Sequence, residues 1–148
     1  RDYVREVLAL SGVPVIDIAG DLRFAETADL LRGASLYVGP DTATSHLAAA
    51  CGTPAVVLFG PTDPRLWGPV PRGGLDAPYA PVAASQRRGN VLLLQEPSLS
   101  CVPCQREGCE RHRLSFSACL DALSAASVIE AVRTLLEPVT TADSSPRA

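Results

Sequence analysis

The chain has 148 residues, of which 47% are hydrophobic and 20% are charged, and its formal net charge is −3. This length allows one compact domain, and the apolar content excludes a chain that is disordered throughout. The 13 basic residues are scattered, which argues against a nucleic-acid partner, and no apolar run approaches the roughly 18–20 residues of a transmembrane segment.

The first 60 residues alternate between helical and strand patterns. Apolar residues at helical spacing predict helices over 3–10 and 24–33, each closed by a glycine. A third helix is expected to open at Asp41, run through Ala50 and end at Gly52. Short, apolar, β-branched runs predict buried strands. These runs are VPVIDI at 13–18, SLYVG at 35–39 and AVVLF at 55–59.

The remaining residues add one strand, one helix and a long connection. Residues 60–90 are rich in Gly, Pro and Arg and predict a surface loop. VLLLQ at 91–95 predicts a further strand, residues 123–137 predict an amphipathic helix, and 138–148 predict a disordered tail. Fully apolar strands that alternate with helices predict an α/β fold with a Rossmann-like parallel sheet, right-handed crossovers and helices on both faces.

Several polar residues stand where the strand at 35–39 ends and the next helix begins. Asp41 can cap that helix, and hydroxyl side chains follow it in the first turn. Amides without an intrahelical partner, together with the positive end of the helix dipole, favour an anion. Ligands of open parallel sheets bind at the carboxyl ends of the strands, so this turn predicts a phosphate-bearing ligand. Ordinary helix capping explains the same residue types and stays open as an alternative.

Four of the five cysteines form a cluster. Cys101, Cys104, Cys109 and Cys119 have the spacing C-x2-C-x4-C-x9-C, and His112 could replace one of them. Four thiolates suit tetrahedral zinc or iron, which predicts a structural site because no coordination position stays open for catalysis. Reduced structural cysteines or a disulfide pair remain alternatives.

Residues 35–69 also resemble a known family. In order, the string carries an acidic helix start, a histidine one turn later, Gly-x-Pro, an apolar strand, Phe-Gly-Pro-Thr-Asp-Pro and Trp-Gly-Pro. This order is similar to glycosyltransferase family 9, the lipopolysaccharide heptosyltransferases and their relatives. The resemblance runs from about Leu22 to Leu136. The matching residues are Asp41, Thr42, His46, Gly52, Pro54, Phe59, Gly60, Pro61, Thr62, Asp63, Pro64, Trp67, Gly68 and Pro69.

The resemblance implies a GT-B architecture with two Rossmann-like domains, of which this chain is part of the C-terminal, donor-binding one. It implies an inverting transfer of heptose from ADP-heptose to the lipopolysaccharide core, in the cytoplasm or at the cytoplasmic face of the inner membrane. No cofactor is implied for catalysis. The implied donor-binding residues are Leu22, Asp41, Thr42, Ala43, Thr44 and His46. Ala43 stands where the family usually has glycine, and its methyl group narrows the space for the ligand.

Around the Phe-Gly-Pro-Thr-Asp-Pro string, turn chemistry is favoured over ligand contact. Asp63 is expected to hydrogen-bond the turn backbone. Trp67 is expected to pack or to line a cleft. Arg65 is a weak candidate for a phosphate contact.

The family resemblance also implies what this chain does not carry. The sequence has no Lys and does not begin with Met, so we expect a fragment or a processed product. The family places its acidic base and the acceptor site in the N-terminal domain and a phosphate-binding Lys early in the C-terminal domain. No catalytic residue is therefore expected here, and the chain alone is expected to be inactive.

The expected organisation is a nucleotide-sugar-binding domain at 1–95, a Cys-rich knuckle at 96–120, a helix at 121–137 and the tail at 138–148. Two other functions compete with the family 9 hypothesis. One is a nucleotide-sugar 2-epimerase, which shares the GT-B shape, although such enzymes usually follow their Asp-Ser-Gly element with a Gly-Gly and an acidic run. The other is a non-catalytic metal-knuckle module that has lost donor binding.

Overall fold

The computed structural model describes residues 2–112 and 114–137, and the predicted tail at 138–148 lies outside the described residues. The elements in chain order are α1 (Asp2–Leu10), α2 (Phe24–Gly33), β1 (Tyr37–Pro40), α3 (Ala43–Cys51), β2 (Ala55–Phe59), α4 (Pro64–Trp67), β3 (Ser85–Arg88), β4 (Val91–Gln95), α5 (Ala118–Asp121) and α6 (Ala125–Leu136). The four predicted helices are present with small shifts of their ends. None of the helices in the described part of the chain is long and apolar enough to cross a membrane.

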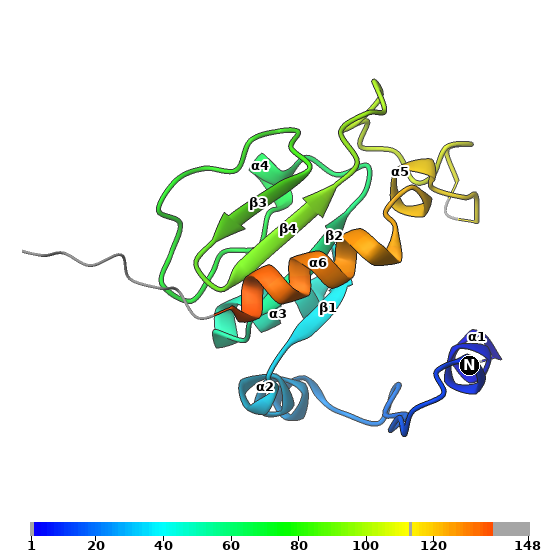
Figure 1. The fold of residues 1–148 in the computed structure, drawn as a ribbon, viewed down its shortest axis with the longest axis vertical. Coiled ribbons are helices and arrows are strands. Elements are labelled where there is room, and N and C mark those ends of the chain that lie inside the picture. Colours follow the sequence, from blue (N-terminus) through cyan, green and yellow to red (C-terminus); the bar gives the residue numbers. More distant parts are fainter. Residues whose placement is uncertain (1, 113, 138–148) are drawn as a thin grey trace, which may run out of the picture.

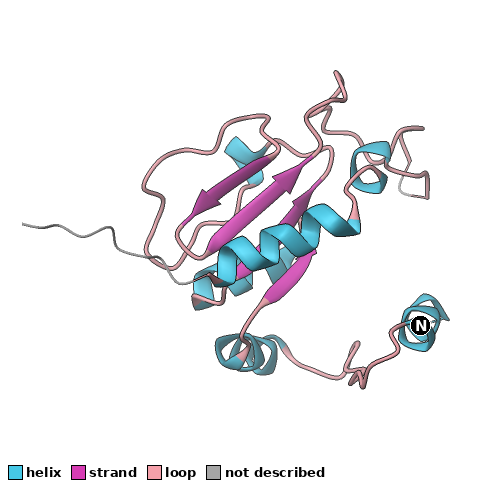
Figure 2. Cartoon of the chain, viewed as in Figure 1, coloured by secondary structure: helices cyan, strands magenta, loops and turns pink. Residues whose placement is uncertain are grey.

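The strands form one sheet in the order β1-β2-β4-β3. β1, β2 and β4 run parallel, with Tyr37 opposite Ala55 and Ala55 opposite Val91. β3 runs antiparallel to β4, as their opposed arrows in Figure 2 show. The α/β class with a Rossmann-like parallel core is therefore confirmed for this partial chain. The second domain of a GT-B architecture stays a prediction.

The predicted loop at 60–90 is only partly a loop, because α4 and β3 lie within it. The sequence of β3, SQRR, does not predict a strand, because it lacks apolar residues. Two residues, Gly89 and Asn90, join it to β4, and Gly89 has a positive φ of 49°. A two-residue hairpin turn favours such residues, so local turn chemistry accounts for this edge strand.

The sheet is covered on both faces, which is why its central strands are apolar throughout. Ala55, Val57 and Phe59 of β2 pack on the face beside α3, whereas Val56 packs with Ala131 of α6 on the other face. Figure 1 shows α6 lying across one face of the sheet, with α3 behind it. Successive side chains of a strand point to opposite faces, so each central strand contributes to both cores.

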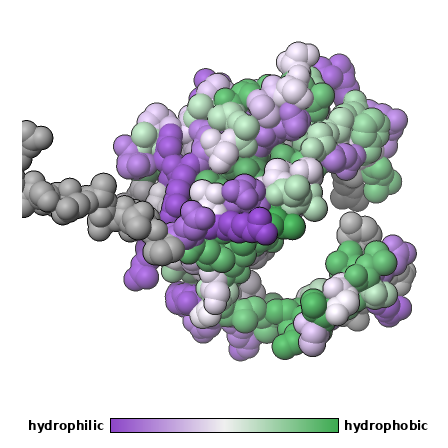
Figure 3. All heavy atoms as spheres, in the orientation of Figure 1, coloured by the Kyte–Doolittle hydropathy of each residue, from purple (hydrophilic) through white to green (hydrophobic). Residues whose placement is uncertain are grey.

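The predicted strand at 13–18 is wrong in this structure. These residues form no strand, and their apolar side chains are exposed, with Val13 65% and Ile16 86% accessible. In Figure 1 this segment and α1 extend away from the sheet, and Figure 3 shows hydrophobic residues on the surface of that extension. A β-branched run indicates a preference for the extended conformation, but a strand also needs a neighbour to pair with, and β1 does not pair with this segment.

Candidate functional site

The site lies at the carboxyl ends of β1 and β2, where α3 begins. Thr42 is the residue that precedes the first helical turn, with φ −147° and ψ 170°, so the helix starts at Ala43 and not at Asp41. The buried Ser45 stabilises this start, because its Oγ accepts the Thr42 amide at 2.9 Å and donates to the Pro40 carbonyl at 2.8 Å. Ala43 and Thr44 therefore present first-turn amides that have no acceptor within the helix.

Asp41 was expected to cap α3, but its carboxylate turns toward the neighbouring strand end. The Thr62 hydroxyl donates to Asp41 Oδ2 at 2.7 Å, and His46 Nε2 lies 3.5 Å from Asp41 Oδ1. The Asp41 amide donates to the Leu58 carbonyl at 3.2 Å, which links the two strand ends. The Asp41 side chain is only 15% exposed, so Thr62 and His46 fix the direction in which the carboxylate points.

The turn after β2 is closed by a separate ion pair. Asp63 accepts the amide of Arg65 at 3.0 Å and a bond from its Nη2 at 2.7 Å. Hydrogen bonding by the Arg65 guanidinium holds the pKa of the buried Asp63 carboxyl below its usual value. The predicted backbone bond of Asp63 is thus confirmed, and Arg65 serves this turn. Trp67 is 54% exposed, so it does not belong to the core.

Two adjoining apolar recesses lie on one side of the α3 N-terminus. The larger, of about 400 Å³, lies between Leu22, Leu31, Tyr37 and Thr44. The second, of about 290 Å³, is lined by Leu22, Phe24, Thr27, Ala43, Thr44 and Leu47. Leu22 and Thr44 line both, so the two recesses form one apolar surface next to the free amides of α3.

A smaller recess of about 170 Å³ lies at the carboxyl ends of β1 and β2. Asp41 and Thr62 are among its polar lining residues, and Leu120 of α5 is among its apolar ones. A recess lined by both a carboxylate and an apolar side chain suits a ligand with hydroxyl groups and C–H faces, such as a sugar.

The structure therefore distributes the predicted donor-binding residues over two neighbouring places. Leu22, Ala43 and Thr44 line the apolar recesses, whereas Asp41 lines the small recess. His46 faces Asp41, and Thr42 lies between the two places at the start of α3. Sequence reasoning missed two residues of the site. Thr62 was visible in the Phe-Gly-Pro-Thr-Asp-Pro string but was assigned to the turn, and Leu120 had no local signal.

The predicted metal site is not assembled in this structure. Within residues 2–112 and 114–137, no three His, Cys, Asp or Glu side chains are grouped so that they could hold a metal ion. Cys109 Sγ accepts the Ala118 amide at 3.4 Å, Cys119 is buried beside the Ser117 hydroxyl, and Cys101 is exposed. His112 pairs with Glu110 at 3.1 Å. The four-cysteine site stays a prediction from the spacing.

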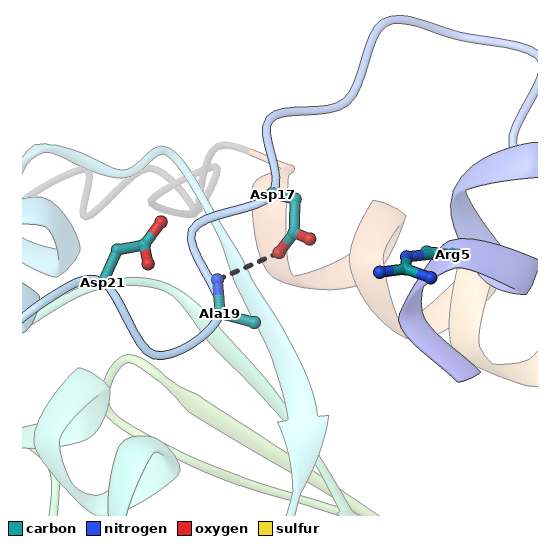
Figure 4. Close-up of a pocket in the computed structure, with 4 residues that line it drawn as sticks. All are labelled: Arg5, Asp17, Ala19 and Asp21. Atoms are coloured by element: carbon teal, nitrogen blue, oxygen red, sulfur yellow. Dashed lines mark hydrogen bonds between the residues drawn. The ribbon is translucent and has the colours of Figure 1, made fainter. Parts of the chain in front are cut away.

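Another pocket, of about 170 Å³, lies between α1 and the segment that precedes α2. Arg5, Asp17, Ala19 and Asp21 line it, and in Figure 4 the Arg5 side chain points from α1 toward Asp17. Asp17 Oδ1 accepts the Ala19 amide at 3.0 Å. Two carboxylates against one guanidinium disfavour a diphosphate. This pocket is therefore a poorer anion site than the start of α3.

Comparison with known proteins gives a consistent result. Residues 2–109 match the model of glycosyltransferase family 9 (heptosyltransferase). Lipopolysaccharide heptosyltransferase 3 of Escherichia coli is 45% identical over 56 residues, which are 38% of this chain and 16% of that protein. Lipopolysaccharide heptosyltransferase 1 of Salmonella typhimurium is 42% identical over 57 residues, 38% of this chain and 18% of that protein. The matches thus span less than a fifth of these relatives. No solved structure matches the chain.

Proposed function

The chain belongs to glycosyltransferase family 9, and we propose that it is the donor-binding part of an inverting enzyme that transfers heptose from ADP-heptose to the lipopolysaccharide core. The observation that carries the proposal is the combination of an apolar surface and a smaller, carboxylate-lined recess next to the N-terminus of α3. Their lining residues fall inside the stretch that matches the family model, except for Leu120. The names of the heptosyltransferase relatives support the choice of sugar and acceptor.

We assign the parts of the donor by their chemistry. An adenine ring is flat and apolar on its faces, so it fits the surface around Leu22. The diphosphate is an anion and fits the amides of Ala43 and Thr44 at the positive end of the helix dipole. The sugar then reaches the recess of Asp41 and Thr62, where a carboxylate can accept bonds from its hydroxyl groups.

The methyl group of Ala43 lines the apolar recess beside Thr44. A glycine at this position would let the diphosphate approach the backbone more closely. We therefore propose that the diphosphate lies slightly farther from the α3 amides here than it would beside a glycine, and that Ala43→Gly tightens ADP binding.

We further propose that the 148-residue chain binds the donor without transferring its sugar. Inverting transfer needs a base that is free to take the proton of the acceptor hydroxyl. Neither Asp41 nor Asp63 is assigned that role, because Asp63 is paired with Arg65 and Asp41 is assigned to the sugar of the donor. Sugar transfer by this chain to any acceptor would contradict this proposal.

Calorimetry with the full 148-residue chain tests the donor assignment. We expect ADP and ADP-heptose to bind and UDP to bind at least about tenfold more weakly, which corresponds to about 1.4 kcal/mol. A response to UDP alone would contradict the proposal in favour of a nucleotide-sugar epimerase. If none of the three ligands binds, the chain is better described as a module that does not bind a donor.

A further inference from the structure

The Cys-rich segment, residues 96–120, packs directly on the turn that carries Thr62. The Gln105 amide donates to the Pro61 carbonyl at 2.7 Å, although 44 positions separate the two residues in the sequence. At the other end of the segment, Leu120 lies over Gly60, where an added Cβ would come within 2.8 Å of the Leu120 Cγ. The absence of a side chain at Gly60 thus allows Leu120 to approach this turn.

Leu120 thereby completes a recess that the strand ends leave open. Asp41 and Thr62 form one wall and are held together by a 2.7 Å hydrogen bond. Leu120 supplies apolar surface to the same space, which has a volume of about 170 Å³. That volume is well below the 290 and 400 Å³ of the apolar recesses, so the position and size of this one side chain strongly affect what fits.

We infer that Leu120 is a specificity-determining residue that limits the size and orientation of the sugar at the Asp41 carboxylate. The inference rests on the proposed function and deepens it, because it gives the Cys-rich segment a part in selecting the donor. The adenine and the diphosphate are assigned to the other two recesses and the α3 amides, and Leu120 lines neither of those recesses. A change at Leu120 should therefore affect a nucleotide that carries a sugar and spare the nucleotide alone.

The test compares ADP with ADP-heptose by calorimetry on the full chain and on the Leu120→Phe variant. The larger ring fills the recess, so we expect ADP-heptose to bind at least about tenfold more weakly while ADP binding changes less than about twofold. Leu114→Phe is the matched control, since Leu114 lies in the same segment and is 88% exposed. It should change neither affinity.

A second variant keeps the inference testable if Leu120→Phe does not fold. Leu120→Ala removes apolar contact with the sugar and should weaken ADP-heptose about three- to tenfold, again without an effect on ADP. If the wild-type chain binds both ligands and both Leu120 variants change the two affinities equally, or change neither, the inference is wrong and the proposed function stands. If the wild-type chain binds neither ligand, the proposed function fails and the inference fails with it.

Discussion

At the scale of single residues, the site depends on how one carboxylate is oriented. Asp41 has two partners that come from different elements, Thr62 from the turn after β2 and His46 from α3. The Thr62 hydroxyl donates a hydrogen bond to Oδ2 of the carboxylate, and Oδ1 lies toward His46. The carboxylate is thus held before a ligand arrives, and a ligand does not have to pay the entropy of ordering it.

Replacing Thr62 should therefore weaken donor binding, because the Asp41 carboxylate loses a partner that holds it in place. Thr62→Val removes a hydrogen bond to a charged group, worth about 1.5–3 kcal/mol, and we expect ADP-heptose to bind about tenfold more weakly. Thr62→Ser keeps the hydroxyl and should bind within about threefold of the wild type. Calorimetry of both variants measures the effect, and wild-type affinity in the valine variant would show that Thr62 does not position Asp41.

Gly68 shows how a family motif can be required by packing alone. A Cβ at this position would lie 2.4 Å from the Pro64 carbonyl oxygen and from an atom of the Tyr79 ring. The φ of Gly68 is −63°, which any residue can adopt, so the backbone conformation does not require glycine here. The requirement comes from the lack of room for a Cβ atom. The Trp-Gly-Pro string thus contains a glycine because an aromatic ring packs against it.

Gly68→Ala should destabilise the chain by about 1–3 kcal/mol, the usual range for overpacking. Urea unfolding of the variant measures the loss. Gly73→Ala is the matched control, because an added Cβ there meets nothing within 4 Å, and it should change the free energy of unfolding by less than about 0.5 kcal/mol. Equal stability of the two variants would rule out the packing argument.

At the scale of elements, the Cys-rich segment combines an observed packing contact with a predicted metal site. Its packing on the Phe59–Asp63 turn is seen in the Gln105 and Leu120 contacts, whereas its predicted metal site is not assembled. Gathering four thiolates around a metal would change the segment between Cys101 and Cys119. Since Leu120 directly follows Cys119, such a change would also reach the Asp41 recess.

Metal analysis of the purified chain tests the prediction that the spacing makes. If the site forms, we expect about one zinc or iron per chain and slow reaction of four thiols until a chelator is added. Cys51→Ser provides the control, because it removes the one cysteine outside the cluster and should leave the metal content unchanged. A metal-free chain with five titratable thiols would leave reduced structural cysteines as the better description.

At the scale of the whole molecule, the loop after α4 is tied to the core by Tyr79. This side chain is buried, donates to the Pro69 carbonyl at 2.9 Å and lies 5.6 Å beneath the Arg88 guanidinium. Burial raises the pKa of Tyr79 to about 12, partly opposed by the charge of Arg88 and assisted by that of Asp76. The folded chain therefore favours the neutral phenol.

This shift predicts a loss of stability at high pH. The contribution of Tyr79 is fully present below pH ~10, the ordinary pKa of tyrosine, and it falls as the pH rises toward 12, because the unfolded chain then releases a proton that the folded chain retains. Urea unfolding between pH 8 and 11 measures the decline. Tyr79→Phe keeps the ring and should show a smaller decline, and an identical decline in both proteins would contradict the assignment.

The amino-acid sequence by itself determined the local elements and the family. The spacing of apolar residues located the helices that became α2 and α6, and the capping residues Asp41 and Gly52 located the helix that became α3. Apolar runs located the strands that became β2 and β4, because both faces of this sheet are buried. The string between Asp41 and Pro69 identified glycosyltransferase family 9, and the family model matches the stretch that contains it.

Only the tertiary structure decided which distant residues meet. The bond between Thr62 and Asp41 joins the ends of two strands, and Leu120 reaches the same recess from 60 positions beyond Gly60. The pattern at 13–18 predicted a strand, but in the folded chain this segment does not pair with the open edge of β1. The periodicity of apolar residues shows which face of a segment can be buried. Strand pairing and the lining of a pocket depend instead on which other segments lie next to it.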